Sequence, residues 1–151
     1  MAGLAPGAFP DRLAAFVIAG GARDMPKDAP DGELTLRTLA MPRDVNVNGD
    51  IFGGWVLSQM DIAAGIVAGA RARGRVATVA VDAMKFIRPV KVGDVLCIYV
   101  KIARIGRTSM ALEIEAWVLR DRQGRREKVT EAVFTFVAID DAGRPRVVPE
   151  G

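Results

Sequence analysis

The sequence predicts an α+β domain in which a five-stranded antiparallel sheet wraps around one long helix. The first observation is a stretch of small and apolar residues at positions 51–70 that carries a single charged side chain, Asp61. The second is a set of five strand-like segments, one before this stretch and four after it. A lone apolar helix can bury its surface only if a sheet curls around it, so this order of elements favours a wrapped helix.

The five predicted strands follow from alternating or β-branched residues. The first, GELTLRTLA, alternates Leu34 and Leu36 with polar residues, which indicates one buried face. The other four are RVATVAVDAMKFIRPV, DVLCIYVKIARI, TSMALEIEAWVLR and EKVTEAVFTFVAID. Their links are short and contain proline or glycine. We therefore expect strands that are neighbours in sequence to pair antiparallel through hairpins or tight turns.

Length and composition predict a single domain. With 50% hydrophobic and 26% charged residues, the 151-residue chain can build one core. Residues 1–31 are rich in Gly, Pro, Ala and Asp and are expected to form a loosely attached tail, which leaves residues 32–151 as the domain. The net charge of +3 comes without the basic stripe of a nucleic-acid binder. One basic run, residues 120–128, is interrupted by acidic and neutral residues and indicates a solvated hairpin turn.

Two scarce residue types exclude several kinds of site. The sequence contains no His, which excludes Ser-His-Asp and Cys-His catalysis and most zinc sites, so no metal is predicted. Its single cysteine, Cys97, lies in a β-like run and is predicted to be a core residue. The N-terminal stretch lacks the basic region of a signal peptide, and Ser58, Gln59 and Asp61 would be costly inside a bilayer. We therefore expect a cytoplasmic protein without a membrane span.

Asp61 is the main candidate for catalysis. A carboxylate within an apolar helix must be paired, capped or used for chemistry. It can activate a water molecule or attack a carbonyl carbon itself; the structural alternative is a carboxylate bonded to backbone or to an Arg across a subunit interface. Its neighbours on the helix are mostly small and predict a narrow slot along this face: Gly54, Leu57, Ser58, Ala64, Gly65 and Ala68.

The segment before the helix supplies further polar candidates. Asn46 can orient a water or a carbonyl group, or serve only as a turn-former. Asp50 is expected to cap the first turn of the helix. Gly53 and Gly54 place N–H groups at the positive end of the helix dipole, where they can polarise a carbonyl; the alternative is tight packing against a strand.

Several separate blocks of the sequence resemble the YciA-type acyl-CoA thioesterases of the hotdog superfamily: TLAMPRDVNVNGDIFGGWVLSQMDIAAGIVA, VATVAVDAMKFIRPVKVGDVLCIYV, GRTSMALEIEAWV and TEAVFTFVAID. The match covers roughly residues 34–149. The resemblance implies a hotdog fold and hydrolysis of short- to medium-chain acyl-CoA to free acid and coenzyme A without a cofactor. It also implies dimers whose sheets join edge to edge, commonly grouped three to a hexamer. It places the family's catalytic Asp at Asp61 and an Asn at Asn46.

Coenzyme A carries phosphates, so the resemblance also predicts basic and hydroxyl groups at the rim of the site. The candidates are Arg88 and Lys91 and, expected from a neighbouring subunit, Arg107, Thr108 and Ser109. Two other classes share the expected fold. A non-catalytic acyl-CoA binding module would have no use for Asp61, and a hotdog dehydratase typically pairs a carboxylate with a His that this chain lacks.

Overall fold

The computed structural model describes residues 29–121 and 124–151. The elements in chain order are β1 (Glu33–Leu39), a 3₁₀ turn η1 (Pro42–Asp44), α2 (Gly53–Ala72), β2 (Val76–Phe86), β3 (Val95–Ile105), β4 (Ser109–Arg120) and β5 (Arg125–Ala138). The tail was predicted at residues 1–31, and residues 1–28 of it lie outside the described residues. Within the described parts of the chain, no helix combines the length and the hydrophobicity that crossing a membrane requires.

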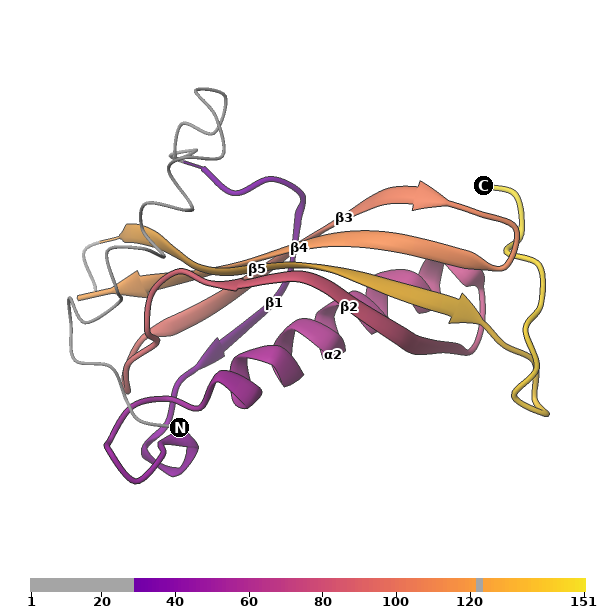
Figure 1. The fold of residues 1–151 in the computed structure, drawn as a ribbon. Helices are drawn as coiled ribbons and strands as arrows, with labels where there is room; N and C mark the ends of the chain where they lie inside the picture. Colours follow the sequence, from indigo (N-terminus) through magenta and orange to yellow (C-terminus); the bar gives the residue numbers. More distant parts are fainter. Residues whose placement is uncertain (1–28, 122–123) are drawn as a thin grey trace.

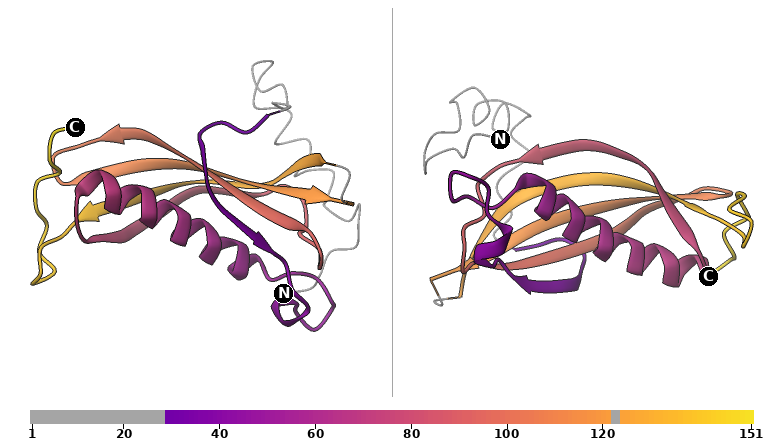
Figure 2. Two further views of the ribbon diagram at one scale, coloured as in Figure 1. Left: turned by 180° about the vertical axis from the view of Figure 1, so that it is seen from behind. Right: turned by 90° about the horizontal axis from the view of Figure 1, so that it is seen from below.

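The five strands form one antiparallel sheet in the order β1-β3-β4-β5-β2, and α2 lies along its concave face (Figures 1 and 2). The predicted α+β architecture is therefore confirmed. The hairpins joining β3 to β4 and β4 to β5 are also as expected, but β2 pairs with β5 and not with its sequence neighbour β3. After α2 the chain enters β2 at one edge of the sheet. The short link at residues 87–94 must therefore pass across the end of the sheet to reach β3.

The core lies between α2 and the sheet. The buried side chains of α2 recur every three or four residues and are mostly alanines: Val56, Met60, Ala63, Ala64, Ala68 and Ala72. Small side chains let the helix approach the sheet closely; a methyl group built at Gly65 would already lie 3.8 Å from the ring of Phe136. The opposite side of the helix is open, with Ile62 and Ile66 about half exposed.

Strand β1 follows its predicted alternation only in part. Leu36 packs against the core, but Leu34 is 40% exposed. The register of the β1–β3 pairing shifts between these two leucines, and this irregularity breaks the simple period of two. The prediction that both leucines share one buried face is therefore wrong for Leu34.

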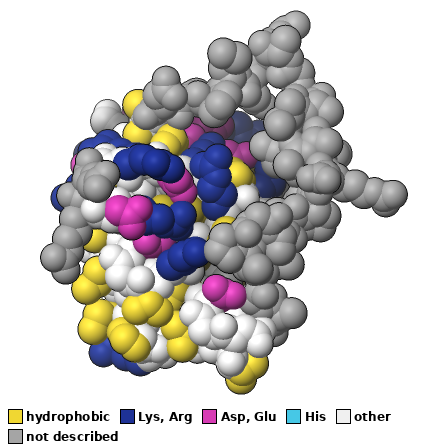
Figure 3. Space-filling view, turned by 90° about the vertical axis from the view of Figure 1, so that its left-hand side faces the viewer, with side chains coloured by type: hydrophobic (Ala, Val, Ile, Leu, Met, Phe, Trp, Pro, Cys, Tyr) yellow, Lys and Arg dark blue, Asp and Glu magenta, His cyan; other side chains and the backbone are white. Residues whose placement is uncertain are grey.

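The basic run at residues 120–128 spans the β4–β5 hairpin, as predicted, with Arg120 paired to Arg125. It is less solvated than expected, because Arg120 and Lys128 are partly buried and each forms ion pairs with carboxylates. Figure 3 looks onto the end of the molecule at which α2 begins and shows Lys and Arg side chains interleaved with Asp and Glu. The charges at this end thus offset one another.

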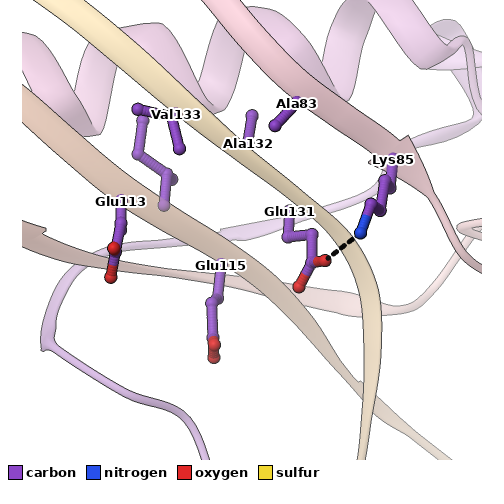
Figure 4. Close-up of a pocket in the computed structure, with 8 residues that line it drawn as sticks. Ala83, Lys85, Glu113, Glu115, Glu131, Ala132 and Val133 are labelled. Atoms are coloured by element: carbon purple, nitrogen blue, oxygen red, sulfur yellow. Dashed lines mark ion pairs between the residues drawn. The ribbon is translucent and has the colours of Figure 1, made fainter. Parts of the chain in front are cut away.

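The outer face of the sheet, away from α2, carries a second small cluster and a set of ion pairs. Cys97 is buried there with Tyr99 and Trp117, which confirms it as a packed residue. Next to it lies a shallow depression of about 200 Å³ lined by charged and small side chains (Figure 4). Lys128 bonds to Glu115 and Glu131; although burial opposes charging, these hydrogen bonds raise the pKa of Lys128 and lower that of Glu131.

Candidate active site

Asp61 lies near the middle of α2 and is partly buried. Its Oδ1 accepts a 2.6 Å hydrogen bond from the hydroxyl of Thr78 on the edge strand β2. The side chain of Asp61 is thus oriented by a neutral hydroxyl donor. Thr78 was not predicted from the sequence, because no local pattern links positions 61 and 78; only the packing of β2 beside α2 brings them together.

Asn46 is 9% exposed and organises the loop before the helix. Its side-chain oxygen accepts the amides of Asn48 at 2.9 Å and Asp50 at 3.2 Å. Its backbone N–H donates to the backbone carbonyl of Asp50 at 2.7 Å. The turn-forming role considered from the sequence is therefore present. A role toward a substrate or a water stays a prediction.

The start of α2 differs from expectation at one residue. The N-cap is Phe52, whose side chain carries no hydrogen-bonding atom, and the helix begins at Gly53. Asp50 does not cap the helix, because Ile51 comes between it and the N-cap and pairs with Val45 in a short bridge. The prediction that Asp50 caps α2 is therefore wrong; its amide instead bonds to Asn46.

Gly54 faces open space. A methyl group built at this position would meet no atom within 4 Å outside its immediate surroundings in the helix. Tight packing against a strand, the alternative considered for the two glycines, does not explain Gly54 within one protomer. The first amides of an α-helix have no acceptor inside the helix, so this end offers donors and a partial positive charge to a ligand.

The predicted slot along the Asp61 face is only partly open. Ala64 and Ala68 are fully buried against the sheet, so the slot does not extend along that half of the helix. Toward the start of the helix, Gly54 and Ser58 are exposed. The accessible part of this face therefore runs from Asp61 toward the helix N-terminus.

The structure separates the two predicted groups of rim residues. Arg88 and Lys91 lie in the link at residues 87–94, where Val90 accepts a hydrogen bond from Ile51 next to the start of α2. Arg107, Thr108 and Ser109 lie at the β3–β4 turn, at the end of the molecule where α2 finishes (Figure 1). Within one protomer these groups do not converge, and the expectation that the second group serves a neighbouring subunit stays a prediction.

Comparison with known proteins agrees with this architecture. The family model described as the thioesterase superfamily matches residues 48–124. The acyl-CoA thioester hydrolase YciA of Salmonella typhimurium is 54% identical over 125 residues, which cover 81% of this chain and 94% of that protein.

Two solved structures show the same fold. The hexameric thioesterase y2039 from Yersinia pestis is 57% identical, with a TM-score of 0.78, and the match covers 82% of this chain and 100% of that one. HI0827, described as a hexameric broad specificity acyl-coenzyme A thioesterase, is 52% identical with a TM-score of 0.76, over 81% of this chain and 84% of that one. The resemblance found in the sequence is confirmed: the chain belongs to the thioesterase superfamily with its hotdog fold, and within it to the YciA-type acyl-CoA thioester hydrolases.

Proposed function

We propose that this protein hydrolyses short- to medium-chain acyl-CoA, with water as co-substrate, to a free acid and coenzyme A. The observation that carries the proposal is the Asp61 carboxylate in the middle of α2, held by the Thr78 hydroxyl at 2.6 Å on the part of the helix that is accessible toward its uncapped start. Family membership supports the reaction class, since a relative that is 54% identical is named an acyl-CoA thioester hydrolase. The broad specificity of HI0827 supports a range of acyl chains.

Two routes are open to Asp61. As a general base it takes a proton from water, which attacks the thioester carbonyl carbon; the carbon–sulfur bond then breaks and the thiolate of coenzyme A leaves. As a nucleophile it attacks the thioester carbon itself; the carbon–sulfur bond breaks, the thiolate of coenzyme A leaves, and water hydrolyses the resulting mixed anhydride in a second step. In both routes the Thr78 hydroxyl would hold one carboxylate oxygen and leave the other free, to face the water in the first route and the thioester carbon in the second.

Negative charge that develops on the thioester oxygen needs stabilisation. The amides of Gly53 and Gly54 are suited to this, because they lie at the positive end of the helix dipole, and the missing side chain at Gly54 admits a substrate. Asn46, in the loop that leads into the helix, would orient the water or the carbonyl. Arg88 and Lys91 would contact the phosphates of coenzyme A.

We further propose that the enzyme is cytoplasmic and assembles into dimers, three of which form a hexamer, with Arg107, Thr108 and Ser109 reaching the site of a neighbour. Exposed apolar side chains support an interface along α2 and the edge strand β2: Ile62 (50%), Ile66 (55%), Val79 (57%) and Val81 (41%). Two related structures are described as hexameric. The separation of the two rim groups in one protomer is also what a shared site would produce.

The test is release of free thiol from acyl-CoA esters of increasing chain length, with wild type beside Asp61→Asn and Asn46→Ala. Asn keeps the size of the Asp side chain and removes its basicity, so kcat should fall by about 10²–10⁴-fold with the fold and the oligomer unchanged. Wild type that binds acyl-CoA without hydrolysing it, or an Asn variant as fast as wild type, would instead support a binding module in which Asp61 is structural.

A further inference from the structure

The proposed reaction makes no use of Asp94, which is the one buried charged residue in the described parts of the chain, with 4% of its surface exposed. It precedes β3 and meets the guanidinium of Arg120, the last residue of β4. Two donors of Arg120 bond to the two carboxylate oxygens, Nε to Oδ1 at 3.2 Å and Nη2 to Oδ2 at 2.9 Å. This fork geometry fixes both side chains. The hydrogen bond to Asp94 also raises the pKa of Arg120.

The pair also bonds to the backbone of the link at residues 87–94. Arg120 Nη2 also donates to the carbonyl of Pro89 at 3.1 Å, and Asp94 Oδ2 accepts the amide of Lys91 at 2.9 Å. On its other side the guanidinium bonds to Glu127 of β5 at 2.9 Å. The link between β2 and β3 is therefore held at several points by a side chain from a central strand of the sheet.

This link in turn supports the start of α2. The amide of Ile51 donates to the carbonyl of Val90 at 3.3 Å, and Ile51 directly precedes the N-cap Phe52. A second pair of hydrogen bonds, Ala40 to Asp94 and Gly93 to Ala40, both 2.9 Å, joins the link to the segment that follows β1. A continuous chain of contacts thus runs from Arg120 to the helix start.

We propose that Arg120 and Asp94 are positioning residues. They hold the start of α2 and the Asn46 loop in the place that these segments must occupy for thioester hydrolysis. This inference rests on the proposed function. Burying an ion pair is weak evidence for a gain in stability, because desolvation offsets the attraction. Catalysis is more demanding, since a displacement of about 1 Å can cost about a hundredfold in rate.

Arg120→Met tests the proposal, with Lys128→Met as the matched control. Their side chains are 23% and 25% exposed, and both form pairs with two carboxylates, but Lys128 lies on the outer face of the sheet. Arg120→Met should lower kcat by about tenfold or more, and KM should rise as well, because the loosened link carries Arg88 and Lys91, which are proposed to contact coenzyme A. Hydrogen exchange should become faster at the amides near the helix start that donate hydrogen bonds, which are those of Ile51, Phe52, Trp55 and Val56. Lys128→Met should lower Tm and leave kcat and this exchange unchanged.

Equal kcat for Arg120→Met and wild type, or equal losses in the two variants, would overturn the inference. If Arg120→Met does not fold, Arg120→Lys, which keeps the charge but not the fork, should show a smaller loss of the same kind. A wild-type protein that does not hydrolyse acyl-CoA would count against the proposed function alone, because hydrogen exchange still compares the two variants at the helix start.

Discussion

The two ends of α2 are finished in opposite ways. At its start, the N-cap is an apolar Phe52, and Gly54 faces open space. At its end, Arg73 adopts the left-handed conformation with φ 51°, its amide reaches the carbonyl of Ala70, and Arg146 donates to the carbonyl of Ala72 at 2.8 Å. The positive end of the dipole is thus left open to a ligand, while the negative end is closed by backbone and cationic donors.

The C-terminal segment completes the closed end. Arg71 donates to the carbonyl of Pro149, and the buried Val148 donates its amide to the carbonyl of Arg107. The same segment that closes the helix therefore also holds the β3–β4 turn. The comparison teaches that stability and activity should depend on different ends of one helix. Substitutions at the open end should change the rate. Substitutions of the residues that cap the closed end, as distinct from the β3–β4 turn residues proposed to reach a neighbour's site, should change the free energy of unfolding.

Among substitutions that compare the two ends of α2, the largest expected effect is at Gly54. Gly54→Ala places a methyl group where the thioester must approach the helix amides and should lower kcat/KM by about a hundredfold. The free energy of unfolding should stay equal or rise by up to about 1 kcal/mol, because alanine favours the helix. Gly69→Ala is the control in the closed half of α2, where a methyl would make only an ordinary contact at 3.6 Å with the carbonyl of Gly74. If both variants hydrolyse acyl-CoA as wild type does, the open end is not the substrate site.

At the closed end, Arg146→Met should reverse the pattern. It removes the donors to Ala72 at 2.8 Å and Ile139 at 3.0 Å and leaves partly buried carbonyls without them. The free energy of unfolding, measured in urea, should fall by about 1–3 kcal/mol with kcat retained. Arg144→Met, at a side chain that is 77% exposed, serves as control. A loss of kcat in Arg146→Met without a loss of stability would break the distinction between the two ends.

Thr78→Val tests the hydrogen bond between β2 and Asp61 in the middle of α2. Removing the 2.6 Å hydrogen bond to Asp61 should lower kcat by about tenfold, as expected for one lost hydrogen bond that orients a reacting group. Stability should change little, because Thr78 is exposed. Thr35→Val, in the opposite edge strand, removes a hydroxyl that bonds only locally to Glu33 and should leave kcat as in wild type. Equal rates in both variants would show that Asp61 needs no orienting partner.

The smallest effect concerns pH. The pKa of Asp140 is lowered, and the main cause is the hydrogen bond from the backbone amide of Arg144. The backbone amide of Ala142 and the guanidinium of Arg144 lower it further. Because the folded-state pKa lies below the unfolded value, this contribution to stability is complete above the unfolded pKa and is lost as pH falls through the folded one. Urea unfolding below pH 4 should therefore show a smaller loss of stability in Asp140→Asn than in wild type. An equal acid loss in both proteins would exclude this carboxylate as a contributor.

Part of the site was predictable because its signals are local. Asp61 stands out as the one charge in the apolar stretch at residues 51–70, Asn46 lies in the segment before the helix, and Gly54 lies in its first turn. Thr78 carried no such signal, since a threonine in a strand is common and its partner is distant in sequence. The pair of the buried Asp94 and the partly buried Arg120 was equally hidden, because both residues lie at strand ends where charged side chains are ordinarily solvated.

The sequence by itself determined the hotdog family and, for residues 29–121 and 124–151, one long helix, five strands and their order. These follow from periodicity, composition and separate motif blocks, which are properties of neighbouring residues. Only the tertiary structure decided that β2 forms the sheet edge beside β5, that Asp50 leaves the N-cap to Phe52, and that Ala64 and Ala68 close half of the predicted slot. The physical reason is that pairing and burial depend on where the helix lies on the curved sheet, and that position results from the packing of the whole chain.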